Sequence, residues 1–423
     1  MEVTPELERR AARPVPEGWG LVSLGACIRP DAPICYGILM PGSHCAGGVP
    51  VVKVRDIVDG RVDESDLLLT HPSVDDAYKR SRLAANDVLV TIRGTTGRVA
   101  LVSSSLNGAN ITQDTARLRI KDGIDARFLY FTLQAEPLQH QIAVHTIGQA
   151  VKGINIRDVR ALVIELPDAL VEQRAIATAL SDVDALLEGL TRLIAKKRDL
   201  KQAAMQQLLT GQTRLPGFRG EWEVKRLGDH VTFLRNGVNS RAELTEEGPV
   251  KYVHYGDVHA CKGTMLFPDA LPSLPSLKAS SLDRLEDGDL ILADASEDLA
   301  GVSKSVEIRG VGTGEVVSGL HTIAARFEKD VLADGFKAYL QFCPPFAGHL
   351  RRLAAGTKVY ATNRAHVASV EMPLPAVDEQ TAIAAVLSDM DAELSALEAR
   401  REKTRVLKQA MMQELLTGRT RLV

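Results

Sequence analysis

A segment of 44 residues occurs twice in this chain. The first copy, residues 172–215, reads EQRAIATALSDVDALLEGLTRLIAKKRDLKQAAMQQLLTGQTRL, and the second, residues 379–422, reads EQTAIAAVLSDMDAELSALEARREKTRVLKQAMMQELLTGRTRL. The copies align without a gap at an offset of 207 residues, with 27 identities in the 44 positions. Two unrelated amphipathic helices could have a similar amino-acid composition. They would not share the blocks LSDxDA, LKQA and LLTGxTRL at the same positions. The chain is therefore one module used twice.

Both copies have the periodicity of a long helix. Apolar residues recur at alternating spacings of four and three, as in the a/d seam of a coiled coil, at Ile176, Leu180, Val183, Leu187, Leu190 and Ile194 in the first copy and at Ile383, Leu387, Met390, Leu394 and Leu397 in the second. Gly211 and Gly418 follow the two runs, where a left-handed C-terminal cap is expected. A helix from Gln173 to Leu209 would be about 55 Å long. We predict that the copies pair within the chain as an antiparallel coiled coil, although periodicity alone also allows a dimer zipper or a buried core hairpin.

The rest of the chain consists of two variable stretches. Runs such as DVLVTI at 87–92 and SVEI at 305–308 are typical of strands, and the run RFLYFTLQA at 127–135 is typical of a helix. The repeat extends weakly into both stretches, since Trp19 and Trp222 head them in the same W-x-x-x-x-L-G pattern. The predicted fold class is α+β, with two mixed α/β domains separated by the two long helices. The predicted segments are an N-terminal segment 1–15, a first domain 16–167, a central helix region 168–215, a second domain 216–375 and a C-terminal helix region 376–423.

Composition excludes several classes of protein. Hydrophobic residues make up 45% of the 423 residues and charged residues 25%, which is the balance of a globular chain and not of a disordered one. The 18 aromatic residues are too few for a protein that binds single strands by base stacking. The N-terminus is acidic and polar, and no window approaches the ~18 apolar residues that span a bilayer. Five cysteines without a C-x-x-C pair predict free thiols, so we expect a cytoplasmic protein with no membrane partner.

The order of these parts resembles the specificity subunit of type I restriction-modification systems. The features that carry the resemblance are the Pro/Gly-rich domain starts with Trp19 and Trp222, the P-x-(3–4)-E-Q-x-x-I-x-x-x-L-S-D-x-D pattern at 167–184 and 375–391, and the LLTGxTRL helix ends. The resemblance covers nearly the whole chain. The alternation of variable domain and repeated helix is more specific than any single motif.

The resemblance implies a DNA-reading role without catalysis. In that family each variable domain is a target recognition domain that reads one half of a split sequence in double-stranded DNA, and the paired helices set the gap between the half-sites. Two methylation subunits dock on the helices, and restriction subunits join the complex. S-adenosylmethionine, ATP and Mg²⁺ are then expected on the partner subunits, and no cofactor or metal is expected on this chain. The alternative is a regulatory or structural protein that spaces two DNA-binding domains on a coiled coil without methylation partners.

Candidate DNA contacts in the first domain are basic and hydroxyl side chains near glycines. Arg side chains can bind phosphate or place a bidentate fork on guanine. The alternative is ordinary solvated surface charge. The candidates form three groups: Lys79, Arg80 and Arg82; Arg93, Thr95, Thr96 and Arg98; and Lys152, Asn155 and Arg157.

Candidates in the second domain lie in two segments. One corresponds by place to 152–157, and the other is a donor-rich loop around an Asn-Gly pair. Asn can pair with adenine, but Asn-Gly is also an ordinary turn dipeptide. These candidates are Arg235, Asn236, Asn239 and Arg241, and then Lys358, Tyr360, Asn363 and Arg364.

Two fragments suggest an enzyme instead. The Gly310-x-Gly-x-Gly turn and Cys343-Pro-Pro-Phe resemble parts of DNA amino-methyltransferases, but Cys343 replaces the residue that should accept the target amino group. His254, His259 and Cys261 have metal-ligand chemistry, yet strand alternation would place the two histidines on opposite faces. We therefore expect neither a catalytic residue nor a metal ligand in this chain.

The charge balance is unusual for a DNA-binding protein. The formal net charge is -3, with no excess charge in 16–167 and four surplus acidic groups in 216–378. A surface that binds phosphate groups normally has an excess of Lys and Arg. We therefore expect the isolated chain to bind DNA weakly and its binding to tighten when a methylation partner is present.

Overall fold

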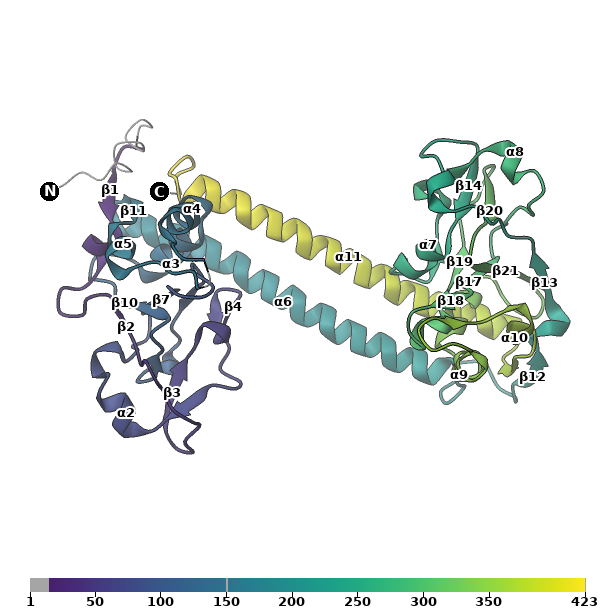
Figure 1. Ribbon diagram of the computed structural model, residues 1–423, viewed down its shortest axis with the longest axis horizontal. Coiled ribbons are helices and arrows are strands. Elements are labelled where there is room, and N and C mark those ends of the chain that lie inside the picture. Colours follow the sequence, from purple (N-terminus) through teal and green to yellow (C-terminus); the bar gives the residue numbers. More distant parts are fainter. Residues whose placement is uncertain (1–14, 150, 423) are drawn as a thin grey trace. The chain divides into compact units, whose positions relative to one another are not determined.

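The computed structural model describes residues 15–149 and 151–422 (Figure 1). The predicted N-terminal segment 1–15 lies outside the described residues except for Val15. The chain divides into two compact units: unit 1 comprises Met1–Leu190 and Arg400–Val423, and unit 2 comprises Thr191–Ala399. Each unit holds one β-rich domain together with a part of each long helix, because the division passes through both helices.

The described part of unit 1 contains a four-stranded sheet, a three-stranded sheet, two two-stranded pairs and four short α-helices. Its strands are β1 (Trp19–Ser23), β2 (Cys35–Tyr36), β3 (Val49–Val52), β4 (Ile57–Val58), β5 (Arg61–Val62), β6 (Leu68–Thr70), β7 (Val88–Thr91), β8 (Val99–Leu101), β9 (Asn110–Ile111), β10 (Thr115–Leu118) and β11 (Val163–Pro167). Its short helices are α2 (Pro72–Asp76), α3 (Ala126–Gln134), α4 (Glu136–His145) and α5 (Ile156–Ala161). The strand order β2-β10-β7-β8 forms an antiparallel sheet, and β6-β3-β9 forms a second sheet in which β3 and β9 are parallel. Phe128 and Leu129 of α3 pack on Val88 and Val90 of β7 in the main core.

Unit 2 repeats this plan with a larger sheet. Its strands are β12 (Glu223–Arg226), β13 (Val231–Leu234), β14 (Val250–Val253), β15 (Met265–Leu266), β16 (Ser273–Leu274), β17 (Leu290–Ala293), β18 (Ala295–Ser296), β19 (Ser305–Ile308), β20 (Glu315–Ser318), β21 (Thr322–Phe327), β22 (Tyr360–Ala361) and β23 (Glu371–Leu374). Its short helices are α7 (Tyr255–Ala260), α8 (Ser276–Ala279), α9 (Pro344–Leu353) and α10 (Arg364–Ala368). The order β13-β21-β17-β19-β15 forms the main sheet, and β16-β14-β20 forms a smaller one.

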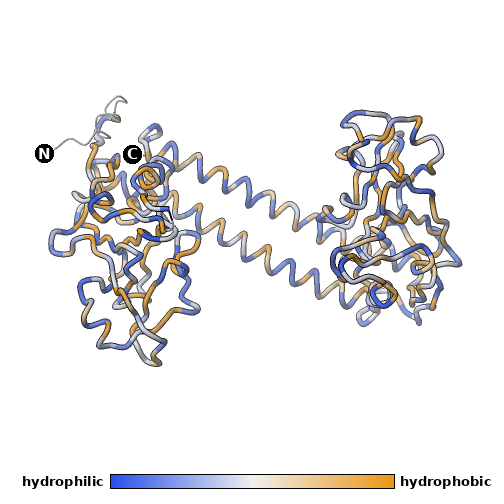
Figure 2. The backbone as a smooth tube through the Cα atoms, in the orientation of Figure 1, coloured by the Kyte–Doolittle hydropathy of each residue, from blue (hydrophilic) through white to orange (hydrophobic). Residues whose placement is uncertain are grey.

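The two repeated segments form the two predicted long helices. These are α6 (Leu170–Leu208) and α11 (Val377–Leu415), each of 39 residues. Figure 2 shows hydrophobic and hydrophilic residues alternating along both. The predicted glycine caps are confirmed, with φ of 71° at Gly211 and 64° at Gly418. A Cβ at Gly211 would lie 3.2 Å from the Trp222 ring, and one at Gly418 would lie 3.1 Å from the Trp19 ring, so each helix end packs on a domain-heading tryptophan.

Within each unit the start of one long helix packs against the end of the other. In unit 1, Ile176 and Leu180 near the start of α6 share a core with Leu415 at the end of α11. In unit 2, Ile383 near the start of α11 shares a core with Leu208 at the end of α6. Ion pairs flank the seam, with Nζ of Lys408 2.6 Å from Asp184 in unit 1 and Nζ of Lys197 2.7 Å from Glu393 in unit 2. The predicted antiparallel packing within one chain is confirmed.

The duplication also extends into the domain frameworks. In unit 1 the guanidinium of Arg119 donates two hydrogen bonds, of 2.8 and 2.7 Å, to the buried carboxylate of Asp87. In unit 2 Arg326, which lies 207 residues later, donates two bonds of the same lengths to the buried Asp289. The first strand of each domain pairs with the last, as β1 with β11 and as β12 with β23. The two domains therefore share a framework on which different loops are mounted.

No helix within residues 15–149 and 151–422 combines the length and the apolar character needed to cross a bilayer.

Candidate nucleic-acid interface

Two predicted segments of unit 1, distant in the sequence, lie side by side. The backbone N–H of Gly94 donates to the carbonyl of Lys152 at 2.9 Å, and Ile154 N–H donates to the carbonyl of Ile92 at 2.9 Å. The first of these segments also reaches the β9–β10 loop, because Ile92 and Arg93 donate to the carbonyl of Asp114 at 2.8 and 3.2 Å. Backbone pairing thus brings the candidates at 93–98 and 152–157 onto one surface.

A loop closed by the same pair of backbone hydrogen bonds occurs in each unit. In unit 1, Ile147 and Gly153 exchange both backbone hydrogen bonds at 2.9 and 2.8 Å, and in unit 2 Ala355 and Ala361 do so at 3.3 and 2.9 Å. The loop starts at Gly148 or Gly356, whose φ of 111° or 138° disfavours side chains. The two loops carry the exposed candidates Lys152 and Lys358.

The other unit 1 candidates differ in what their side chains contact. Arg93, Thr95 and Arg157 are exposed, as is Asn155, which donates to Asp158 at 3.4 Å. Thr96 shares a hydrogen bond of 3.2 Å with Thr146.

The side chains of two arginine candidates donate hydrogen bonds to other groups of unit 1. Arg98 donates from Nη1 to the carbonyls of Val54 and Ile57 at 3.2 and 3.0 Å. Arg82 donates from Nε to the buried carboxylate of Asp75 at 2.7 Å. Of its neighbours, Lys79 lies 3.6 Å from Asp76, and Arg80 is exposed beside the Tyr36 ring. The guanidinium groups of Arg82 and Arg98 therefore have intramolecular partners that a DNA contact would have to share.

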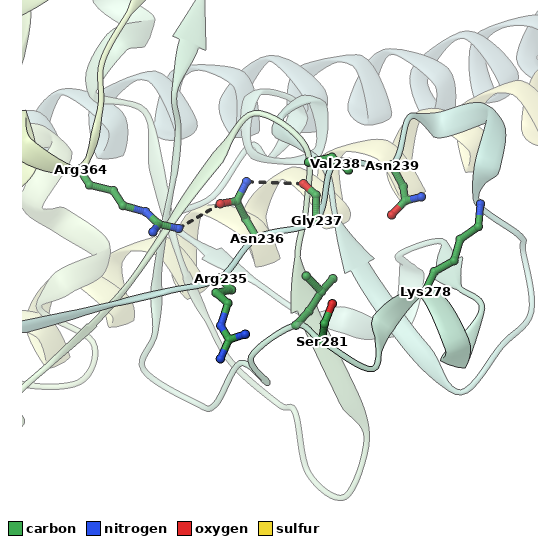
Figure 3. Close-up of a pocket in the computed structure, with 9 residues that line it drawn as sticks. Arg235, Asn236, Gly237, Val238, Asn239, Lys278, Ser281 and Arg364 are labelled. Atoms are coloured by element: carbon green, nitrogen blue, oxygen red, sulfur yellow. Dashed lines mark hydrogen bonds between the residues drawn. The ribbon is translucent and has the colours of Figure 1, made fainter.

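In unit 2 a cavity of about 380 Å³ gathers four candidates (Figure 3). Arg235, Asn236, Asn239 and Arg364 line it. Arg364 crosses between the two predicted segments, because its Nη2 donates to Asn236 Oδ1 at 3.0 Å and to the carbonyl of Leu234 at 2.6 Å. The remaining lining residues, which the sequence did not single out, are Gly237, Val238, Lys278, Ser281 and Leu282.

Glu243 organises the polar side of this cavity. The Lys278 ammonium donates to its carboxylate at 2.8 Å, Ser240 N–H donates at 2.9 Å and Asn239 Nδ2 donates at 3.0 Å. The Lys278 bond, with these two others, lowers the pKa of Glu243 to about 2. Arg235 remains 73% exposed at the cavity mouth. The cavity therefore presents oriented donors and cationic groups, which suits a phosphate or a base edge.

The remaining unit 2 candidates are more constrained. Arg241 pairs with Asp257 at 2.6 Å, and Tyr360 is half-buried in β22. The Asn363 side chain caps α10 by accepting His366 N–H at 2.9 Å. Lys278 was missed because nothing in its local sequence distinguishes it from a surface lysine.

A groove in unit 1 was also missed by sequence reasoning. It has a volume of about 550 Å³, and basic and acidic groups alternate along it. Its charged lining residues are Arg29, Asp87, Arg119, Lys121, Asp122, Asp125, Arg127 and Arg174. The Arg119–Asp87 pair at its wall belongs to the shared framework, so part of this charge has a structural role.

The side chains that suggested a metal site have structural partners. His254 caps α7 by accepting Gly256 N–H at 3.2 Å, and His259 contacts the carbonyl of Ala295 at 3.0 Å. The expectation that strand alternation separates the two histidines is wrong, because His259 lies in α7. No group of three potential ligands was found among the described residues.

The fragment at Cys343 packs in the core. The thiol is fully buried, and burial raises its pKa to about 12. It contacts the carbonyl of Tyr339 at 3.7 Å, and the following prolines begin α9. This is a packing role at the start of a helix.

Known proteins that are similar to this chain in sequence or fold are specificity subunits of type I restriction systems. Residues 46–196 match the type I restriction modification DNA specificity domain. The type I restriction enzyme EcoBI specificity subunit of Escherichia coli is 29% identical over 238 residues, which cover 55% of this chain and 48% of that protein. The MjaVIII specificity subunit of Methanocaldococcus jannaschii is 22% identical over 96% of this chain and 94% of that protein. The crystal structure of the S subunit from M. genitalium has the same fold, with a TM-score of 0.58 and 16% identity over 94% of this chain and 96% of that one.

The chain is similar to specificity subunits of type I restriction enzymes over nearly its whole length, and residues 46–196 match the DNA specificity domain of these systems. The chain spans about half the length of the EcoBI subunit in their alignment and nearly all of the MjaVIII subunit.

Proposed function

We propose that this chain reads a bipartite target in double-stranded DNA, each unit recognising one half, while partner subunits carry out the chemistry. The observation that carries the proposal is a duplicated framework with a different polar surface in each unit. The Arg119–Asp87 and Arg326–Asp289 pairs show the shared framework. The donor-rich loops mounted on it differ in residue type, as expected if they read different half-sites.

The helix pair is proposed to set the gap between the half-sites and to dock two methylation subunits. Two near-identical helix segments present near-identical surfaces, and identical surfaces bind identical partners. Restriction subunits would join through this assembly. S-adenosylmethionine, ATP and Mg²⁺ are assigned to the partners, and no cofactor is assigned to this chain.

Methylation mapping tests the recognition role. The chain is expressed with its methylation subunit, and methylated bases are mapped across the genome. We expect a split motif that disappears when the gene is deleted. Replacing residues 16–167 with another recognition domain should change one half of the motif and leave the other half intact. If no motif depends on the chain, or if both halves change together, modular reading is refuted.

The spacing role has its own test. One heptad inserted at matched positions in both helices preserves the seam and adds about 10 Å to each helix. That length corresponds to about three base pairs of DNA. We expect the gap to lengthen or binding to be lost, and an unchanged gap would remove the helices from this role.

The low net charge leads to a binding prediction. Neither domain has a basic excess, so the isolated chain lacks the electrostatic attraction that supports nonspecific binding. We expect weak DNA binding by the isolated chain and tighter, motif-dependent binding by the complex with its methylation subunit. Tight and selective binding by the chain alone would favour the alternative, a regulatory DNA-binding protein without methylation partners.

A further inference from the structure

His321 adopts a backbone conformation that few residues other than glycine hold. Its φ is 55°, in the left-handed region, at the short connection between β20 and β21. The conformation is maintained because the carbonyl of His321 accepts the Asp294 N–H at 3.1 Å. The backbone of His321 is therefore strained, while its side chain is 53% exposed. Backbone strain at an exposed residue suggests that the side chain itself has a role.

The imidazole of His321 is oriented from two sides. Its Nδ1 lies 3.1 Å from Asp294 Oδ1, and its ring meets the Tyr255 ring edge-on, with centroids 5.6 Å apart and an interplanar angle of 87°. A neutral imidazole that donates from Nδ1 to a carboxylate has Nε2 as its acceptor. Asp294 therefore selects the tautomer, and Tyr255 restricts the ring.

His321 lies where the unit 2 candidate segments meet. Asn236 Nδ2 donates to the carbonyl of Gly319 at 3.3 Å, which joins the cavity loop to the β20–β21 connection. Thr362 N–H donates to the carbonyl of Asp294 at 2.8 Å, which joins the 358–364 segment to the partner of His321. These bonds place His321 next to the polar surface described above.

Unit 1 has a different side chain at the same place in its framework. Asp114 corresponds to His321 at the 207-residue offset that also relates Arg119 to Arg326. Its carbonyl accepts Ile92 N–H at 2.8 Å, as the carbonyl of His321 accepts Asp294 N–H. The same backbone hydrogen bond thus occurs at an aspartate in one unit and at an oriented imidazole in the other, and of the two residues only His321 has a positive φ.

We propose that His321 is a specificity-determining residue of unit 2. Its Nε2 accepts a hydrogen bond from the exocyclic amino group of adenine or cytosine, the two major-groove donors that a base edge offers. Asp294 acts as a positioning residue by holding the acceptor tautomer. This inference rests on the proposed function, because it assigns one base contact within the half-site that unit 2 reads.

The test uses the complex of the full chain with its methylation subunit. Once the motif is mapped, duplexes carrying each of the four base pairs at every position of the unit 2 half-site are compared for binding and methylation. His321→Gly removes the ring at a backbone position where glycine is favoured. We expect discrimination at one base pair to fall about tenfold, as for a mismatch in a specific site. His321→Asn tolerates the left-handed backbone but cannot place an acceptor at the Nε2 position, and it should show the same loss.

Control variants separate base reading from folding. Asp59 has a positive φ of 48° in the β4–β5 turn of unit 1, so Asp59→Gly relieves the same kind of backbone strain as His321→Gly. Asp59→Gly should leave discrimination in the unit 2 half-site unchanged. Asp294→Asn should weaken discrimination at the same base pair as His321→Gly. The inference is overturned if His321→Gly leaves discrimination unchanged at every position, or if it lowers the melting temperature and affinity for all duplexes alike. If the wild-type complex has no split motif, the proposed function itself fails.

Discussion

Gln380 offers a sharp test of how each domain is joined to its helix. This side chain, which is 1% exposed near the start of α11, makes three hydrogen bonds to backbone groups of unit 2. Its Nε2 donates to the carbonyls of Val331 and Pro375 at 2.8 and 2.9 Å, and its Oε1 accepts Ala333 N–H at 2.9 Å. We predict that Gln380→Ala destabilises unit 2 strongly, because three backbone groups lose their partners in a buried place.

The duplication supplies an internal calibration. Gln173 is the unit 1 counterpart and makes two such bonds, from Nε2 to the carbonyl of Pro167 at 2.8 Å and from Asp125 N–H to Oε1 at 2.9 Å. At about 1 kcal/mol for each buried group left unpaired, Gln380→Ala should cost about 3 kcal/mol and Gln173→Ala about 2 kcal/mol. Gln202, exposed on α6 within unit 2, provides a matched control, and Gln202→Ala should change stability by less than about 0.5 kcal/mol.

Fluorescence can report on each unit separately. The chain has two tryptophans, Trp19 in unit 1 and Trp222 in unit 2. In a Trp19→Phe background, guanidinium unfolding followed by Trp222 reports on unit 2, and the reciprocal background reports on unit 1. A loss below about 1 kcal/mol for Gln380→Ala would refute the assignment, as would a smaller loss than that of Gln173→Ala. A shift as large with Gln202→Ala would show that the effect is not specific to the buried bonds.

Three further predictions concern the loop, the thiols and a buried tyrosine. Gly356→Ala should disorder the loop it starts, because its Cβ would lie 1.8 Å from the carbonyl oxygen of Val359 at a φ of 138°, and limited proteolysis within 356–360 should increase. Of the five thiols, the half-buried Cys45 and Cys261 should react with a thiol reagent in the folded protein, and all five should react after unfolding; fast reaction of a third thiol would contradict the packing. Burial raises the pKa of Tyr339 from 10 to about 12, so the unfolded state ionises first and the free energy of unfolding should fall between these pH values. Tyr339→Phe should remove that part of the slope in an alkaline titration, and an unchanged slope would contradict it.

Much of the architecture was accessible from local sequence. The helix pair follows from the repeated heptads, and the glycine caps follow from residues that tolerate a left-handed backbone. The strand and helix runs at 87–92, 305–308 and 127–135 became β7, β19 and α3. These features depend on contacts between residues close in sequence or on a pattern repeated in register.

The polar surfaces were less accessible. Sequence reasoning named Arg82, Arg98 and Arg93 alike as candidate DNA contacts, although Arg82 binds Asp75, Arg98 binds two carbonyls, and Arg93 is exposed. It also passed over Lys278, which enters the cavity through a contact with a glutamate 35 residues earlier. The sequence around an arginine does not show whether its guanidinium donates hydrogen bonds within the protein or faces the solvent.

The sequence by itself determined the duplication and the two long helices, because periodicity and caps act over a few residues, and it predicted their antiparallel pairing, which the packing within each unit established. Only the tertiary structure decided which polar groups are used within the fold and which face outward. It joined segments more than 50 residues apart, such as Gly94 with Lys152 and Asn236 with Gly319. It also placed His321, two residues after Gly319, in a left-handed backbone conformation. A donor or acceptor can serve only one or two partners at a time, and the packing of the whole domain decides which groups those are.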